Sequence, residues 1–135
     1  MSIISPTGKK TIRIDSAGSG KFGAPRGSRK HSGIDLEVEP GQPIMAPMKC
    51  LIKRKAIPYA DTPYYSGVLL IDGPVQIKLF YFDPDLSKIG SMVEKGEVIG
   101  VAQDISERYG PQMIPHLHME MRVYGVLVDP EQMLA

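Results

Sequence analysis

All three histidines of the chain fall in two short clusters whose residue types suit a metal ion. The first cluster is His31-Ser-Gly-Ile-Asp35 and the second is His116-Leu-His118. Imidazole and carboxylate groups are natural ligands of Zn²⁺, and a catalytic zinc site uses three protein ligands and one water. Zinc lowers the pKa of that water to about 7, which supplies hydroxide at neutral pH. The clusters therefore indicate a zinc hydrolase, whereas three unrelated surface histidines are the simpler alternative.

The second cluster opens a segment of alternating polar and apolar residues, residues 116–122. Side chains two apart on a strand point to the same face, with Cα atoms about 6.6–7 Å apart. The alternation predicts a strand with both histidines on one face and Leu117, Met119 and Met121 in a core. Two imidazoles on one face can divide the work, since one can bind the metal while the other lies beside its water.

His31 and Asp35 are four residues apart, and on a straight strand they would be separated by about 13 Å. That is too far for two ligands of one ion. The apolar alternation over 34–38 predicts a strand that begins near Asp35, and Gly33 allows the preceding loop to fold back. The proposed ligand set is then His31, Asp35 and His118, with water as the fourth ligand.

The elements that must position these residues are those of a turn-rich β protein. Glycine and proline are abundant, with 14 and 12 residues, tryptophan is absent and the apolar runs are short. We expect a compact, mainly antiparallel β-sheet domain with little helix. Strands are expected over 11–14, 34–38, 43–57 (bent near Pro47), 67–71, 75–82 and 116–123, with a hairpin at Asp72-Gly73, a turn leading into a strand over 93–101, and one helical turn over 129–134 capped by Asp129.

Composition excludes several classes of protein. The 135 residues suffice for one domain with a real core. A net charge of +1 argues against a nucleic-acid partner, and no apolar run is long enough to span a membrane. The single cysteine, Cys50, excludes an internal disulfide framework. A biotin- or lipoyl-carrier domain would need Lys49 at a hairpin tip, and it lies well before the expected hairpin.

Three blocks of the sequence resemble the lysostaphin/LytM-type peptidoglycan endopeptidases, peptidase family M23. Phe22-Gly-Ala-Pro-Arg-Gly-Ser-Arg-Lys-His-Ser-Gly-Ile-Asp-Leu36, followed by 40–47, is similar to the first family motif, and 115–122 is similar to the second. Residues 88–100 match the turn and strand between them. The resemblance covers roughly residues 22–133. It implies an M23-like zinc-binding β domain over 22–135 after an N-terminal extension over 1–21 that carries a short strand.

The resemblance implies that His31, Asp35 and His118 bind zinc and that His116 activates or orients the water. In this family the hydroxide attacks a peptide bond in the stem or cross-bridge of peptidoglycan, so the expected partners are peptidoglycan peptides. The N-terminal residues lack the apolar core of a signal peptide. This fits an enzyme released by phage or by lysis, or one that acts at the cell envelope, and leaves the compartment open.

One departure from the family pattern concerns a further histidine, usually in a Tyr-x-His-Leu context before the Lys-x-Gly turn. Counting back from the turn at 93–96 puts Tyr81 at that place. A tyrosine hydroxyl can hydrogen-bond an oxyanion, but its pKa of about 10 makes it a poor proton shuttle. A packed core tyrosine is the alternative.

Residues 26–31 together with Phe80-Tyr81 are also similar to a non-catalytic subgroup related to leukocyte cell-derived chemotaxin 2. This likeness supports a second function: a zinc-stabilised module that binds peptidoglycan or a protein without turnover.

Two pairs of residues are candidates for substrate binding. Arg26 and Arg29 lie in a basic loop and can pair with the carboxylates of stem peptides, because a guanidinium fork matches a carboxylate. Tyr64 and Tyr65 lie, with Tyr59, in a proline- and tyrosine-rich loop whose rings can line a groove. Solvated loops are the alternative for both pairs.

Overall fold

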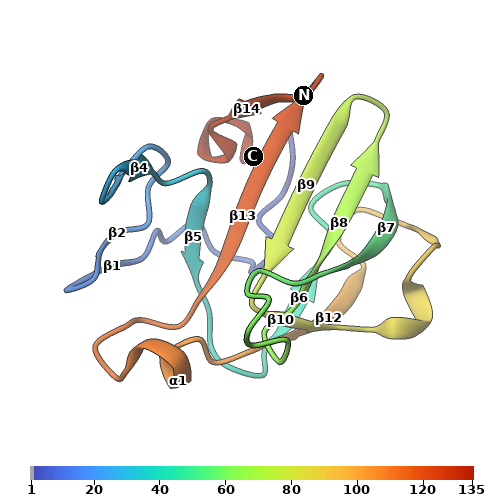
Figure 1. Ribbon diagram of the computed structural model, residues 1–135. Coiled ribbons are helices and arrows are strands. Elements are labelled where there is room, and N and C mark those ends of the chain that lie inside the picture. The colour runs from blue at the N-terminus through green and yellow to red at the C-terminus, as the bar shows by residue number, and fades with distance from the viewer. Residues whose placement is uncertain (1) are drawn as a thin grey trace.

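A seven-stranded antiparallel sheet dominates the computed structural model, which describes residues 2–135 (Figure 1). Its strands run in the order β11-β7-β8-β9-β13-β14, and β5 pairs with the start of β13. Their bounds are β5 (Ile34–Glu37), β7 (Cys50–Ala56), β8 (Gly67–Asp72), β9 (Val75–Phe80), β11 (Met92–Val93), β13 (His116–Val123) and β14 (Val126–Val128).

Three smaller antiparallel sheets complete the fold of residues 2–135. They are β10 (Phe82–Pro84), β12 (Val98–Ala102) and β6 (Pro43–Met45); β1 (Ile14–Asp15) and β2 (Gly18–Ser19); and β3 (Pro25–Arg26) and β4 (Arg29–Lys30). The helices are short: η1 (Leu86–Lys88), α1 (Ser106–Tyr109) and η2 (Pro130–Met133). Among the described residues, no helix has the length and apolar character needed to cross a membrane. The predicted mainly β, antiparallel fold with little helix is confirmed.

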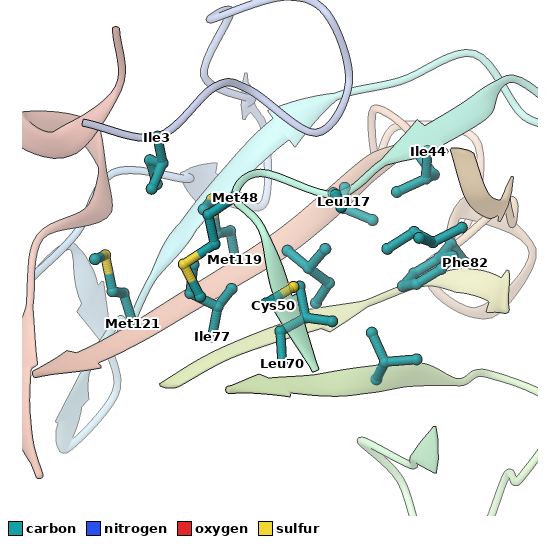
Figure 2. Packing of buried hydrophobic residues seen from close by; sticks show 14 of the residues in the cluster. Ile3, Ile44, Met48, Cys50, Leu70, Ile77, Phe82, Leu117, Met119 and Met121 are labelled. Atoms are coloured by element: carbon teal, nitrogen blue, oxygen red, sulfur yellow. The ribbon is translucent and has the colours of Figure 1, made fainter. Parts of the chain in front are cut away.

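Strand β13 is an inner strand of the large sheet and lies between β5 and β9 (Figure 1). The predicted alternation of polar and apolar side chains along this strand is confirmed, because Leu117, Met119 and Met121 are fully buried in the core (Figure 2). Because successive side chains point to opposite faces, the two histidines of β13 lie on the other face. The apolar face therefore anchors the strand while the polar face is left for chemistry.

The N-terminal segment contributes to the same core. Ile3 is fully buried among core residues and forms a bridge with Leu134, so both chain ends lie close together (Figures 1 and 2). Further along, Ile12 pairs with Leu36 of β5 in an isolated bridge. The division of the chain after residue 21 stays a prediction, while these contacts join the segment to the domain that follows it.

Two expected strands are each divided in the structure. The stretch 43–57 forms β6 and β7, which belong to different sheets, and the chain crosses between them around Pro47, which has no N–H for a ladder. The stretch 75–82 divides at Tyr81, where a φ of 78° turns the chain from β9 into β10. A positive φ in a bulky residue is uncommon and interrupts the extended backbone.

Local signals placed other elements well. The hairpin between β8 and β9 closes with Asp72 opposite Val75. At the C-terminus the Asp129 side chain accepts a hydrogen bond from the Glu131 amide and caps η2. At the N-terminus the regular strand begins at Ile14 rather than at residue 11.

Candidate metal centre and groove

Three ligand atoms from two distant parts of the chain converge at one end of β13. His31 Nε2 lies 3.2 Å from Asp35 Oδ1 and 3.2 Å from His118 Nδ1, and the last two atoms are 3.0 Å apart. Ligands bound tetrahedrally to zinc at about 2.0–2.1 Å are separated from each other by ~3.3 Å. The three atoms therefore form one face of a tetrahedron that a zinc ion fits, with the fourth corner open.

Strand pairing explains why two of these groups meet. β5 runs antiparallel to β13 with Asp35 directly opposite His118, and such cross-strand neighbours share a face with Cβ atoms about 4.5–5.5 Å apart. His31 reaches the same point because the chain turns at Gly33. A Cβ at Gly33 would lie 2.1 Å from the Met119 carbonyl oxygen, so only glycine allows this close approach.

The ring nitrogens that point away from the triangle have their own acceptors. His31 Nδ1 lies 3.1 Å from the Lys21 carbonyl oxygen, and His118 Nε2 faces Glu120 Oε1 at 3.6 Å. Glu120 is in turn fixed by a 2.7 Å hydrogen bond from Ser32 Oγ. These oxygens only accept, so we assign the N–H of each imidazole to the outer nitrogen. When each ring is neutral, as metal binding requires, its lone pair then points into the triangle.

His116 lies beside the triangle without belonging to it. Its Nδ1 is 2.9 Å from the Ile114 carbonyl oxygen, and its Nε2 is 3.7 Å from Asp35 Oδ2. The carbonyl assigns the N–H to Nδ1 and leaves a lone pair on Nε2. Burial lowers the pKa of His116 more than the nearby Asp35 carboxylate raises it. The imidazole is therefore neutral near pH 7 and can accept a proton.

The charges of the cluster favour a cation at its centre. Burial alone would raise the pKa of Asp35, but its close contacts with the His118 and His31 rings lower it well below its usual value. Contact with His118 lowers the pKa of Glu120 to about 2. Burial would lower the pKa of His118, yet the two carboxylates raise it to about 9. Both acids thus stay ionised and stabilise a positive charge between them, which a divalent ion supplies.

A groove of about 680 Å³ surrounds the cluster, within the size range of small-ligand sites. Its wall combines basic residues with tyrosines. The lining includes Arg13, Arg26, Arg29, Lys30 and Lys78, the tyrosines Tyr59, Tyr81 and Tyr109, and the central residues His31, Asp35, His116, His118 and Glu120.

Tyr81 lies where the count from the turn placed it, next to the histidines. Its ring packs edge-on against His116 with centroids 5.3 Å apart. Its hydroxyl is 2.7 Å from that of Tyr59, which is 2.6 Å from that of Tyr109. The Arg108 guanidinium lies 3.9 Å above the Tyr59 ring. Burial raises the pKa of Tyr81 to about 12, so its hydroxyl stays protonated and can donate.

The predicted arginines and tyrosines have different locations. Arg26 and Arg29 line the groove, and Arg26 Nη2 lies 3.8 Å from Asp35 Oδ2. Tyr64 is 63% exposed and borders a separate hollow, whereas Tyr65 is buried in a small cluster. Neither of these tyrosines lines the groove.

Two residues at the site, Tyr109 and Arg13, were missed from the sequence. Tyr109 forms the aromatic wall together with Tyr59, the one residue of the tyrosine-rich loop's expected set that lines the groove. Arg13 is buried and donates hydrogen bonds to Asp35. Its signal was a charged residue inside an expected apolar strand.

Comparison with known proteins places the chain in a family. The model of peptidase family M23 matches residues 29–130. A protein of Haemophilus influenzae named "Uncharacterized metalloprotease" is 31% identical over 103 residues, which are 76% of this chain and 20% of that protein. The chain thus spans about a fifth of the length of this relative.

Solved structures show the same fold. Csd3 of Helicobacter pylori matches with a TM-score of 0.73 at 18% identity, over 100% of this chain and 33% of that chain. The catalytic domain of the antimicrobial peptidase lysostaphin from Staphylococcus simulans matches at 0.64 and 23%, over 85% and 88%. A zinc-containing peptidase from Vibrio cholerae matches at 0.66 and 21%, over 97% and 40%. Because the family model matches most of this chain, residues 29–130, the chain belongs to peptidase family M23.

Proposed function

We propose that this protein is a zinc-dependent endopeptidase that cleaves peptide cross-links or stem peptides of bacterial peptidoglycan. The observation that carries the proposal is the triangle of His31, Asp35 and His118, with a neutral His116 beside it inside a groove. Family membership and the metalloprotease relative support a peptidase. The likeness to lysostaphin, an antimicrobial peptidase, supports a cell-wall substrate.

Each residue of the cluster has a role in this proposal. His31 Nε2, Asp35 Oδ1 and His118 Nδ1 would hold the zinc ion, which when bound lowers the pKa of a water to about 7. His116 Nε2 accepts a proton from the attacking water and returns it to the leaving amine, the usual work of a general base and acid. Its Nδ1–H bond to the Ile114 carbonyl keeps the ring in the orientation that this transfer needs.

Tyr81 is assigned the donor role for the oxyanion. Its hydroxyl can accept from Tyr59, which accepts from Tyr109, so that its own proton points to the substrate. A chain of hydrogen bonds strengthens its terminal donor. The raised pKa suits a donor that never loses its proton.

The basic side of the groove is assigned to the substrate's carboxylates. Arg26 and Arg29 lie on the β3–β4 hairpin beside the metal triangle, where they can form forked bonds with a carboxylate. Tyr59 and Tyr109, which line the groove, take the role of aromatic substrate contacts in place of Tyr64 and Tyr65. A phage-borne or lysis-released enzyme, or one acting at the cell envelope, would meet such peptides.

A second function is favoured by the tyrosine at position 81. With a pKa of about 12 it cannot exchange protons near neutral pH. If turnover requires a histidine there, the protein is a zinc-stabilised module whose groove binds a peptidoglycan peptide or a protein ligand.

Release of soluble muropeptides from purified sacculi separates the two functions. Zinc-loaded protein is incubated with glycine-bridged and with directly cross-linked sacculi, and His116→Ala serves as the control because it leaves the three ligands in place. Release by the wild type alone supports the endopeptidase. No release from either substrate, with one zinc bound per chain, contradicts it and favours the binding module.

A further inference from the structure

Asp35 uses only one of its two carboxylate oxygens in the metal triangle. The other oxygen, Oδ2, accepts hydrogen bonds from Arg13 Nη2 at 3.1 Å and from Arg13 Nε at 3.3 Å. The two side chains are 3% and 4% exposed. The guanidinium is rigid and planar, so its two bonds hold this oxygen in place. The remaining oxygen is thereby aimed at His31 and His118.

Arg13 is itself held in place on several sides. Its Nη1 donates to Asp15 Oδ1 at 2.7 Å and to the Gly18 carbonyl at 3.3 Å. Its amide donates to the Asp35 carbonyl at 2.8 Å, and its carbonyl accepts from the Gly20 amide at 2.7 Å. A Cβ at Gly20 would lie 2.7 Å from the Cβ of Asp35. The N-terminal segment thus packs directly against Asp35, the proposed metal ligand.

The same network reaches His116, the proposed general base. Asp15 Oδ2 accepts a 2.9 Å bond from the Ile114 amide, and the Ile114 carbonyl is the acceptor for His116 Nδ1. The path Asp35–Arg13–Asp15–Ile114–His116 therefore joins a metal ligand to the general base. It runs through a segment outside the part of the chain that the family model matches, residues 29–130.

Stability alone gives a weak reason for this arrangement. Desolvating a buried ion pair costs about as much as the attraction returns, and apolar replacements are often as stable or more so. Arg13 and Asp15 are 3% and 5% exposed, and their side chains reach Asp35 and the Ile114 amide at the proposed site. A role in the geometry of that site accounts for the placement of both charges.

We propose that the Arg13–Asp15 pair is a positioning device that keeps Asp35 a one-oxygen ligand and aligns His116 with it. This inference rests on the proposed zinc site. Without the fork, Asp35 is free to rotate and offer both oxygens, which would fill the position meant for water. Arg13 and Asp15 are not members of the metal triangle and act through Asp35 and Ile114.

The test measures metal binding and geometry on Arg13→Lys and Asp15→Asn. Zinc affinity is measured by competition with a chromophoric chelator, and coordination by the absorption spectrum of the Co²⁺-substituted protein. Removing a residue that orients a ligand typically weakens metal binding by about 10–100-fold. We expect a loss of that size in Arg13→Lys, with weaker cobalt absorption as a fifth ligand joins the ion. In Asp15→Asn we expect kcat to fall more than zinc affinity.

Thermal unfolding of the metal-free variants separates positioning from stability. Ile77→Val is the control, because Ile77 is fully buried in β9 and lies outside the groove lining. It should lower the melting temperature and leave zinc affinity and the cobalt spectrum unchanged. If Arg13→Lys folds and shows the control's pattern, the inference is wrong while the zinc site stands. If the wild type binds no zinc, both the inference and the proposed function are wrong.

Discussion

Replacing Tyr81 with phenylalanine removes one hydroxyl from the groove and tests whether that hydroxyl donates to the oxyanion. Loss of one such donor typically lowers kcat by about 10²–10³-fold, or ~2.7–4 kcal/mol of transition-state stabilisation. The hydroxyl also bonds Tyr59 at 2.7 Å, and losing this bond costs about 0.5–1.5 kcal/mol of unfolding free energy. For a chain of 135 residues this shifts the melting temperature by only ~2–6 °C. The variant therefore stays folded at assay temperature while its turnover falls.

The assay is the rate of release from dye-labelled sacculi at saturating and at limiting substrate. We expect kcat to fall and KM to change little, because the hydroxyl acts on charge that develops in the transition state. Tyr124→Phe is the control, since Tyr124 is 83% exposed and lies outside the groove lining. A folded Tyr81→Phe variant with wild-type kcat would refute the donor role.

The companion change, Tyr81→His, restores the residue that the family pattern has at this place. Histidine is among the residues enriched at positive φ, so it should tolerate the φ of 78° at this position. Its ordinary pKa of about 6.5 allows proton exchange near neutral pH. If the tyrosine limits turnover, the variant should be faster than the wild type. No gain would argue that Tyr81 is not the missing catalytic group.

Three further predictions concern the metal, the close approach of two strands and the thiol. Zinc at about 1,000 times its Kd should stabilise the protein by ~4 kcal/mol, which raises the melting temperature by ~15 °C. EDTA should reverse this shift, and the His118→Ala variant should not show it. Gly33→Ala should lower the free energy of unfolding by about 1–3 kcal/mol, because its Cβ would lie 2.1 Å from the Met119 carbonyl oxygen. The same change should weaken zinc binding, and an unchanged melting temperature would contradict this prediction. Burial raises the pKa of the Cys50 thiol to about 12. At pH 8 the thiol should therefore react with a disulfide reagent only as fast as the protein unfolds. Rapid labelling of the native state would contradict its burial.

The parts of the fold that could be predicted from the sequence are those set by local patterns. The alternation over 116–122 fixed which face of β13 enters the core, because the side-chain period of a strand is two. Asp129 and the turn after Asp72 marked their elements through hydrogen bonds and backbone preferences within a few residues. The residue types of the two clusters, together with the family motifs, were enough to select His31, Asp35 and His118, which converge at the triangle.

The parts that could not be predicted depend on contacts between distant residues. Nothing near Tyr81 signals its positive φ, which is imposed where the chain leaves one sheet for another. The tyrosine-rich loop did not reveal which rings face inward, since Tyr59 turns to the groove while Tyr64 does not. The contact of Arg13 with Asp35 follows from backbone pairing that only the folded chain displays.

The most direct test of the account is hydrolysis of cross-linked sacculi in H₂¹⁸O by the zinc-loaded protein, followed by mass spectrometry of the released peptides. The account predicts one new amino group for each new carboxyl group, one ¹⁸O atom in that carboxyl group, and no product from His116→Ala. Soluble products without new amino groups, or equal release by wild type and His116→Ala, would contradict a peptidase mechanism at this site.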